Sequence, residues 1–178
     1  RLKPEIELDS LKQVNYEYSF LIDISGSMAG RKLEEAKRAL RIGLRNLLAG
    51  DFFNIIAFES EYELFSQVPV AYSQRTLDAA DRWINSLYSK GGTEIYEPLK
   101  FVLEDELADN CSKRIVFLFT DGQVANEKQI VSLVSRHAKT SSVFPFGIDT
   151  AVNKYFIDEV AMAGNGIPEY IYPGERIE

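Results

Sequence analysis

The stretch Tyr18-Ser19-Phe20-Leu21-Ile22-Asp23-Ile24-Ser25-Gly26-Ser27 decides the fold of this chain. The run before the aspartate carries no charge and is mostly aromatic or aliphatic, which is typical of a strand covered on both faces in a parallel sheet. A carboxylate and two hydroxyls follow it, each two residues after the last. Because ligands bind at the carboxyl ends of the strands in an open parallel sheet, we expect Asp23, Ser25 and Ser27 to lie at a binding edge.

The oxygen atoms of these three side chains indicate what they could bind. One carboxylate and two neutral hydroxyls are hard donors, the ligand class of Mg²⁺, Mn²⁺ or Ca²⁺ rather than of Zn²⁺ or copper. Asp and Ser are also common in helix caps and turns, so Asp23 and Ser25 could equally cap the helix that follows. These residues alone leave both interpretations open.

Strand and helix patterns alternate along the rest of the chain. Apolar residues recur at helical spacing from Leu33 to Leu47, with charged residues between them, and a second buried run follows at Phe52–Phe58. Repeated βαβ units require parallel strands, right-handed crossovers and helices on both faces of the sheet. The sequence therefore predicts an α/β fold, a doubly wound three-layer α/β/α sandwich with a mostly parallel six-stranded sheet and one short antiparallel edge strand. We expect strands over about 16–23, 52–58, 62–65, 114–120, 142–148 and 167–172, and helices over about 31–48, 74–87, 95–107, 126–138 and 153–163.

The composition is that of an ordinary folded domain and excludes several classes of function. Of the 178 residues, 46% are hydrophobic and 26% charged, and no apolar run approaches the ~20 residues that cross a membrane, so we expect no direct membrane insertion. The formal net charge of −7 argues against nucleic acid as a partner, because phosphate binding needs a basic field. With the single cysteine Cys111 and the single histidine His137, the chain has no cluster for structural zinc.

The length favours one large domain over two small ones. Residues 1–15 show no regular pattern and are interpreted as a lead-in segment, and residues 16–178 as a single domain. Since the chain begins at Arg1 without an initiator methionine or a signal peptide, we expect it to be a piece of a longer protein.

Two further motifs belong to the same edge of the predicted sheet as Asp23. Gly91-Gly92-Thr93 forms a turn before a helix, and Phe119-Thr120-Asp121-Gly122 ends another buried strand. Two carboxylates roughly neutralise a dication, and hydroxyls add coordination without charge, which leaves the metal electrophilic toward an outside anion. Five oxygen-bearing residues can thus meet on one rim: Asp23, Ser25, Ser27, Thr93 and Asp121. Taken alone, Thr93 could be a turn residue and Asp121 a strand-end cap.

These motifs together resemble a known family. Asp-Ile-Ser-Gly-Ser at 23–27, Gly-Gly-Thr at 91–93 and Phe-Thr-Asp-Gly at 119–122 are similar, in order and spacing, to the von Willebrand factor A (VWA) domain, and the likeness covers nearly the whole chain. The resemblance implies a Rossmann-like fold and a metal-ion-dependent adhesion site (MIDAS). At that site the five residues would hold Mg²⁺, or else Mn²⁺ or Ca²⁺, directly or through water. Within the family, the chain is similar to the VWA domain of inter-alpha-trypsin inhibitor heavy chains and their bacterial relatives.

The resemblance implies binding rather than catalysis. It predicts a protein-binding or cell adhesion module and not an enzyme. In such a module the metal coordinates a Glu or Asp of a partner protein. The resemblance also favours an extracellular or cell-surface location. It also implies a final helix after the last strand. Because the chain ends at Glu178, before such a helix, we expect apolar surface near the last strand to be uncovered.

Three questions stay open on the sequence. A neighbouring domain of the same protein could fill the metal site and make the domain structural. Asp23 could be the nucleophile of a Mg²⁺-dependent phosphotransferase, but enzymes of the haloacid dehalogenase type place a second Asp where this chain has Ser25, and no Gly-rich phosphate loop with Lys is present. Glu94 could repel an acidic ligand, occupy its position or cap the next helix.

Overall fold

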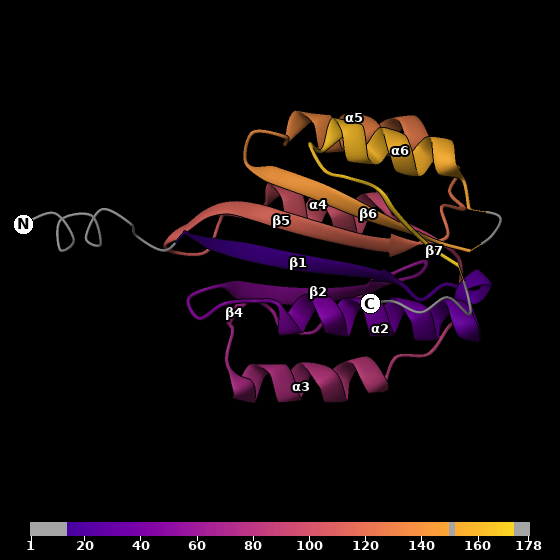
Figure 1. The fold of residues 1–178 in the computed structure, drawn as a ribbon. Helices are drawn as coiled ribbons and strands as arrows, with labels where there is room; N and C mark the ends of the chain where they lie inside the picture. The colour runs from indigo at the N-terminus through magenta and orange to yellow at the C-terminus, as the bar shows by residue number, and fades with distance from the viewer. Residues whose placement is uncertain (1–13, 150–151, 173–178) are drawn as a thin grey trace, which may run out of the picture.

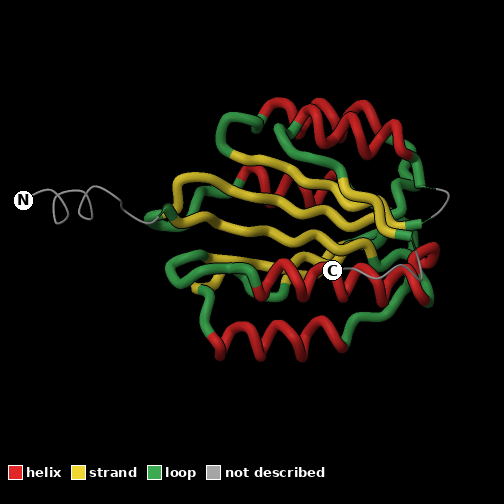
Figure 2. The backbone as a smooth tube through the Cα atoms, in the orientation of Figure 1, coloured by secondary structure: helices red, strands yellow, loops and turns green. Residues whose placement is uncertain are grey.

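A sheet of seven strands forms the middle layer of the structure, a computed structural model that describes residues 14–149 and 152–172 (Figures 1 and 2). Nearly all of the predicted lead-in segment therefore lies outside the described residues. The strands are β1 (Asn15–Asp23), β2 (Phe52–Phe58), β3 (Tyr62–Leu64), β4 (Val70–Ala71), β5 (Cys111–Thr120), β6 (Ser141–Ile148) and β7 (Glu169–Ile171). The helices are the 3₁₀ turn η1 (Gly26–Met28), α2 (Arg31–Arg45), α3 (Gln74–Asn85), α4 (Tyr96–Glu104), α5 (Glu127–Arg136) and α6 (Lys154–Ala163).

The strand order is β3-β2-β1-β5-β6-β7, which puts the two strands with the predicted aspartates side by side. Strands β1, β2, β5, β6 and β7 run parallel, and the short strands β3 and β4 both pair antiparallel to β2. The predicted mostly parallel α/β sandwich is confirmed. The two-residue strand β4 was not predicted, because two residues carry no periodic pattern that a sequence could reveal.

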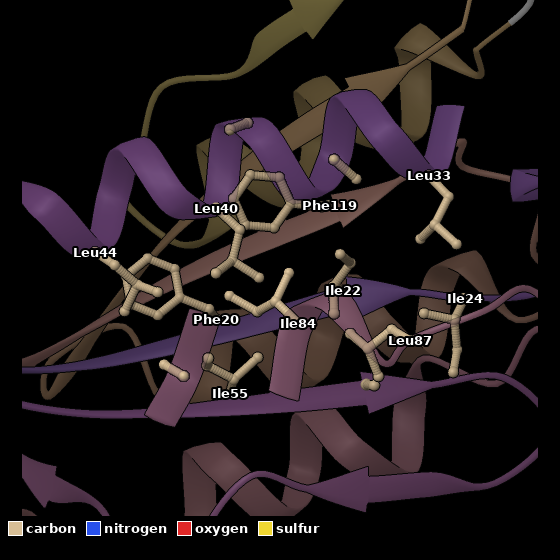
Figure 3. Packing of buried hydrophobic residues seen from close by; sticks show 14 of the residues in the cluster. Phe20, Ile22, Ile24, Leu33, Leu40, Leu44, Ile55, Ile84, Leu87 and Phe119 are labelled. Carbon is tan, nitrogen blue, oxygen red and sulfur yellow. The ribbon is translucent and has the colours of Figure 1, made fainter. Parts of the chain in front are cut away.

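Strand β1 is buried on both faces over 19–23, as the uncharged run 18–22 predicts. Alternate residues of a strand point to opposite faces, so Phe20 and Ile22 join one hydrophobic cluster while Leu21 joins the other. Figure 3 shows Phe20 and Ile22 among side chains of the covering helices, including Leu40 of α2 and Ile84 of α3. Full burial of side chains of this size stabilises the fold by roughly 1.5 to 3 kcal/mol each.

The helices divide between the two faces of the sheet. Side chains of α2 and α3 belong to the cluster under one face, and side chains of α4, α5 and α6 belong to the cluster under the other (Figure 1). All the predicted helices are present, but α2 and α3 end two or three residues before the expected Leu48 and Leu87. Leu47 and Leu87 are still buried, since the chain just past each helix continues to pack on the core.

A buried ion pair ties β1 to β5 near the amino end of the sheet. The Arg114 Nε lies 2.5 Å from Glu17 Oε2, and both side chains are almost fully buried. The same guanidinium donates hydrogen bonds to the carbonyl oxygens of Leu103, Asp105 and Glu106. The pair thus fixes the chain after α4 against the end of the sheet opposite to the predicted metal ligands.

An apolar groove lies next to β7, where the sequence predicts uncovered apolar surface. It encloses about 530 Å³ between α2 and the sheet, and Ile42 of α2 lines one wall. Its floor holds stacked rings from three strands: the centroids of Phe20 and Phe117 are 5.3 Å apart, and those of Phe119 and Phe146 are 4.8 Å apart. That a further helix fills this groove stays a prediction.

Candidate metal centre

The pairing of β1 with β5 brings the two predicted aspartates to one edge of the sheet. Ile22 of β1 is in register with Phe119 of β5, so each strand reaches its carboxyl end at the same level. The Thr120 hydroxyl donates a hydrogen bond to Asp23 Oδ2 over 2.8 Å. Asp121 follows directly, and only 2% of its side chain is exposed.

The loop after β1 folds back on Asp23. The backbone N–H of Ser25 donates to Asp23 Oδ1 over 2.8 Å, and the hydroxyl oxygens of Ser25 and Ser27 lie 3.1 Å apart. Ser25 is buried, whereas Ser27 is exposed at the start of the loop into α2. The structure therefore brings together the first three predicted ligands.

The loop that carries Thr93 lies against this serine loop. The Gly26 N–H donates to the Gly91 carbonyl over 3.0 Å, and on the other side the Gly92 N–H donates to the Ser60 hydroxyl over 2.8 Å. Gly91 has a φ of 69°, and a side chain there would collide with the Glu59 carboxylate. Among the described residues, the Thr93 hydroxyl makes no hydrogen bond to the other four predicted ligands, and the link between the two loops is the Gly26–Gly91 backbone hydrogen bond.

Asp121 has one carboxylate oxygen without a hydrogen bond. Its Oδ1 accepts from the Gln123 N–H over 3.2 Å, but Oδ2 is buried and has no hydrogen-bond partner within the described structure. The Lys32 ammonium lies 3.8 Å from Oδ2. Buried polar atoms are nearly always paired, so this carboxylate oxygen has capacity left to accept a ligand.

Asp23 is a buried carboxylate with a raised pKa. Burial, with a smaller contribution from the negative charge of Asp121, raises the pKa of Asp23 to about 6, while hydrogen bonds from Ser25 and Thr120 act in the opposite direction. Two carboxylates close together in a buried site repel each other unless a positive charge neutralises them. The donor set of carboxylate and hydroxyl oxygens thus fits a hard divalent cation.

Glu94, the acidic residue next to Thr93, has a local structural role. Glu94 Oε1 accepts a hydrogen bond from the Glu97 N–H over 3.3 Å in the first turn of α4. This contact agrees with the third of the possibilities raised for Glu94, that it caps the following helix. In the described parts of the chain, no group of three or more His, Cys, Asp or Glu side chains could hold a metal, so a cation here depends on the hydroxyls.

Four residues of this edge were missed by the sequence analysis. Thr120 fixes Asp23, Ser60 holds the glycine loop, and Lys32 forms an ion pair of 2.7 Å with Asp149. Thr120 carries a signal in the sequence, since a hydroxyl residue directly before the strand-end aspartate is well placed to bond across to the neighbouring strand. The other three are brought here by the tertiary fold alone.

The fold and these side chains define a Rossmann-like α/β domain with a candidate cation site at the carboxyl edge of its sheet. The profile of the von Willebrand factor type A domain matches residues 17–170, and the chain belongs to this family. Domains of this family generally mediate protein interactions, and some carry a metal at a MIDAS.

Curated relatives share the domain at moderate identity. A von Willebrand factor A domain-containing protein of Dictyostelium discoideum is 39% identical over 168 residues, which cover 93% of this chain and 8% of that protein. The human von Willebrand factor A domain-containing protein 5B1 is 32% identical over 169 residues, which cover 94% of this chain and 14% of that protein. The chain thus spans a small part of the relatives it matches. The narrower likeness to inter-alpha-trypsin inhibitor heavy chains stays a prediction.

Solved structures share the fold at low identity. A von Willebrand factor type A protein from Catenulispora acidiphila superposes with a TM-score of 0.77 at 19% identity, covering 90% of this chain and 39% of that one. The proximal thread matrix protein 1 of the mussel byssus, with a zinc-occupied MIDAS motif, gives a TM-score of 0.67 at 14% identity over 88% of this chain and 41% of that one.

No helix within the described residues is long and apolar enough to cross a membrane.

Proposed function

We propose that this domain binds a protein partner through a divalent cation held at the carboxyl edge of the sheet. Mg²⁺ is the expected ion, with Mn²⁺ or Ca²⁺ as alternatives. When bound, the cation would offer an electrophilic position to a Glu or Asp side chain of the partner. No covalent bond is made or broken. The proposed ligands, directly or through water, are Asp23, Ser25, Ser27, Thr93 and Asp121.

The observation that carries this proposal is the buried, unbonded Oδ2 of Asp121 beside a second buried carboxylate. The hydroxyl oxygens of Ser25 and Ser27, 3.1 Å apart, add neutral donors from the adjoining loop. The two negative charges balance those of one dication, so the site would carry no excess negative charge to repel an acidic side chain of the partner. The zinc-occupied MIDAS motif of the mussel byssus protein supports the proposal by analogy.

Residues around the ligands would hold them ready for the cation. Thr120 and the Ser25 amide each bond one oxygen of Asp23, which fixes the plane of the carboxylate. The Gly26–Gly91 hydrogen bond joins the two ligand loops, so neither can move away alone. Such surrounding contacts tune the orientation and basicity of metal ligands.

Thermal unfolding of chelator-stripped protein tests the metal site. Added Mg²⁺ or Mn²⁺ at about a hundredfold over its dissociation constant should stabilise the fold by roughly 2.7 kcal/mol. For a chain of this length that corresponds to a rise in Tm of about 5 to 10 °C. An unchanged Tm at millimolar Mg²⁺ and Mn²⁺ would reject the site.

Substitutions separate the site from a general effect of salt on the protein. Asp121→Asn and Ser25→Ala should each remove most of the Tm rise, because the first loses a charge and the second a buried donor. Ser132→Ala, an exposed serine on α5, is the matched control and should respond like the wild type.

The nature of the partner is tested once one has been captured on immobilised domain in Mn²⁺. Chelation, Asp23→Ala and replacement of the partner's critical Glu or Asp by its amide should each abolish binding. Any two of these changes together should reduce binding no more than one alone, because all of them break the same coordination bond. Binding that persists in EDTA would reject this mechanism for that partner. If an acidic side chain of a neighbouring domain instead occupies the metal, the longer protein should not bind added partner.

A further inference from the structure

A lysine shares the candidate metal ligand Asp121 with the proposed cation. Lys32 is the second residue of α2, and its ammonium lies 3.8 Å from Asp121 Oδ2 and 2.7 Å from Asp149 Oδ2. The two carboxylates follow the neighbouring strands β5 and β6, so Lys32 reaches from the helix to both strand ends. Only 23% of its side chain is exposed.

The charge of Lys32 acts on the oxygen of Asp121 that lacks a hydrogen bond. Because Coulomb energies fall only as the inverse of distance, and a partly buried site is poorly screened, two cations attached to one carboxylate oppose each other. Lys32 already supplies part of the positive charge that Asp121 needs. A divalent cation therefore gains less from this carboxylate than it would if Lys32 were neutral.

Asp149 affects how strongly the charge of Lys32 acts on Asp121. Its ion pair with Lys32 is more than 1 Å shorter than the contact with Asp121, so it holds the ammonium back from the candidate ligand. Asp149 has a φ of 143°, which L-residues rarely adopt, and strained backbone of this kind concentrates at functional sites. Its backbone N–H also donates to the Ile171 carbonyl on β7, which fixes this position in the sheet.

We propose that Lys32 sets the cation affinity of the site, lowering it by its charge, and that Asp149 limits this effect by binding the lysine. The inference rests on the proposed metal site, of which Lys32 and Asp149 are not ligands. It assigns the pair a role beyond fastening α2 to the strand ends. A fastening role and an electrostatic role predict different changes in metal affinity.

Titration of chelator-stripped protein with Mn²⁺ alone, followed by calorimetry or by the electron paramagnetic resonance of free Mn²⁺, measures that affinity. Lys32→Met should bind Mn²⁺ about tenfold tighter than the wild type, a coupling typical of interacting sites. Lys32→Arg should stay close to the wild type because it keeps the charge. The matched control is Lys128→Met, an exposed lysine on α5 that forms no ion pair among the described residues; its affinity should not change.

Asp149→Asn provides a second, opposite change. With its stronger partner neutralised, Lys32 should turn toward Asp121 and weaken Mn²⁺ binding. The double variant Lys32→Met/Asp149→Asn should bind like Lys32→Met, because Asp149 acts through the lysine. Circular dichroism and thermal melts in EDTA establish that each variant is folded. If Lys32→Met does not fold, Lys32→Gln removes the same charge with a polar side chain and takes its place in the single and the double variant.

The outcomes separate this inference from the proposed function. Wild-type binding of Mn²⁺ with equal or weaker binding by folded Lys32→Met would overturn the role of Lys32 and leave the metal site standing. Equal affinity in Asp149→Asn and the wild type would overturn the role of Asp149. Absence of Mn²⁺ binding in both the wild type and Lys32→Met would reject the metal site, and this inference with it.

Discussion

Replacing Asp23 by asparagine should stabilise the metal-free protein at pH 7. Burial, aided by the charge of Asp121, raises the pKa of Asp23 to about 6, against 3.8 for an unperturbed aspartate. One pKa unit corresponds to about 1.4 kcal/mol, so keeping Asp23 ionised at pH 7 costs the folded state about 3 kcal/mol. An asparagine side chain carries no charge and avoids this cost.

The substitution also changes the hydrogen bonds that Asp23 makes in the structure. The amide oxygen of the new side chain could still accept from the Ser25 N–H, but its NH₂ group would face the Thr120 hydroxyl, which now donates to Asp23 and already accepts from Gly122. A lost hydrogen bond costs about 1 kcal/mol. We therefore expect Asp23→Asn to gain on the order of 1 to 2 kcal/mol in EDTA, or roughly 2 to 8 °C in Tm.

The pH dependence has a definite sign. Because the folded pKa of Asp23 lies above its unfolded value, the folded state binds more protons between about pH 4 and 6. The cost is therefore full above pH 6 and shrinks as the pH falls. Between pH 7 and pH 5, the wild type in EDTA should gain about 1 kcal/mol of unfolding free energy relative to Asp23→Asn.

Urea unfolding in EDTA at pH 7 and pH 5 measures both effects, with Asp109→Asn as a control at an exposed aspartate. In Mg²⁺ the order should reverse, since only the wild type gains binding energy. An Asp23→Asn variant that in EDTA is no more stable than the wild type at pH 7 would contradict the cost assigned to the buried carboxylate. An equal response of the two proteins to pH would contradict it as well.

Three further substitutions test other parts of the structure. Gly91→Ala should lower the Tm and weaken the Mg²⁺ response, because a φ of 69° strains an L-residue and the added methyl group would displace the Glu59 carboxylate; an unchanged response would mean that this loop does not position a ligand. Arg114→Met should reduce the unfolding free energy by about 3 to 5 kcal/mol in urea titrations, since Glu17 is left buried and unpaired, and a loss below about 1 kcal/mol would contradict this. Ile42→Glu should reduce the fluorescence of a hydrophobic dye bound in the groove beside α2, whereas undiminished fluorescence would place the dye elsewhere.

The placement of the two aspartates could be predicted because both follow local patterns. Asp23 ends β1 after the uncharged run 18–22, Asp121 follows the uncharged run 115–120 of β5, and the carboxyl ends of parallel strands share an edge. The strand Phe52–Phe58 was predicted with the bounds that the structure has, since its apolar run is interrupted only by Asn54. Asn54 bonds Ser66, a partner that no local pattern reveals.

The rest could not be predicted because it depends on contacts between distant residues. The Thr120–Asp23 hydrogen bond joins positions 97 residues apart, and the ion pair of Lys32 with Asp149 exists only because β6 ends beside the start of α2. The buried Lys37 is a further case, since its ammonium donates a hydrogen bond to the Leu87 carbonyl, 50 residues away in the chain. A pattern in the sequence cannot distinguish a charged side chain in water from one paired inside the fold.

By itself, the sequence determined the layered α/β class, the central place of β1 and the edge that carries Asp23 and Asp121. These follow from hydrophobic periodicity and the direction of parallel strands, which act over a few residues. Only the tertiary structure decided the electrostatic state of that edge: which oxygen of Asp121 lacks a hydrogen bond, how far burial raises the pKa of Asp23, and that Lys32 stands next to both strand ends. Charges interact through space, and their distances and burial are set by packing between elements that the chain separates widely.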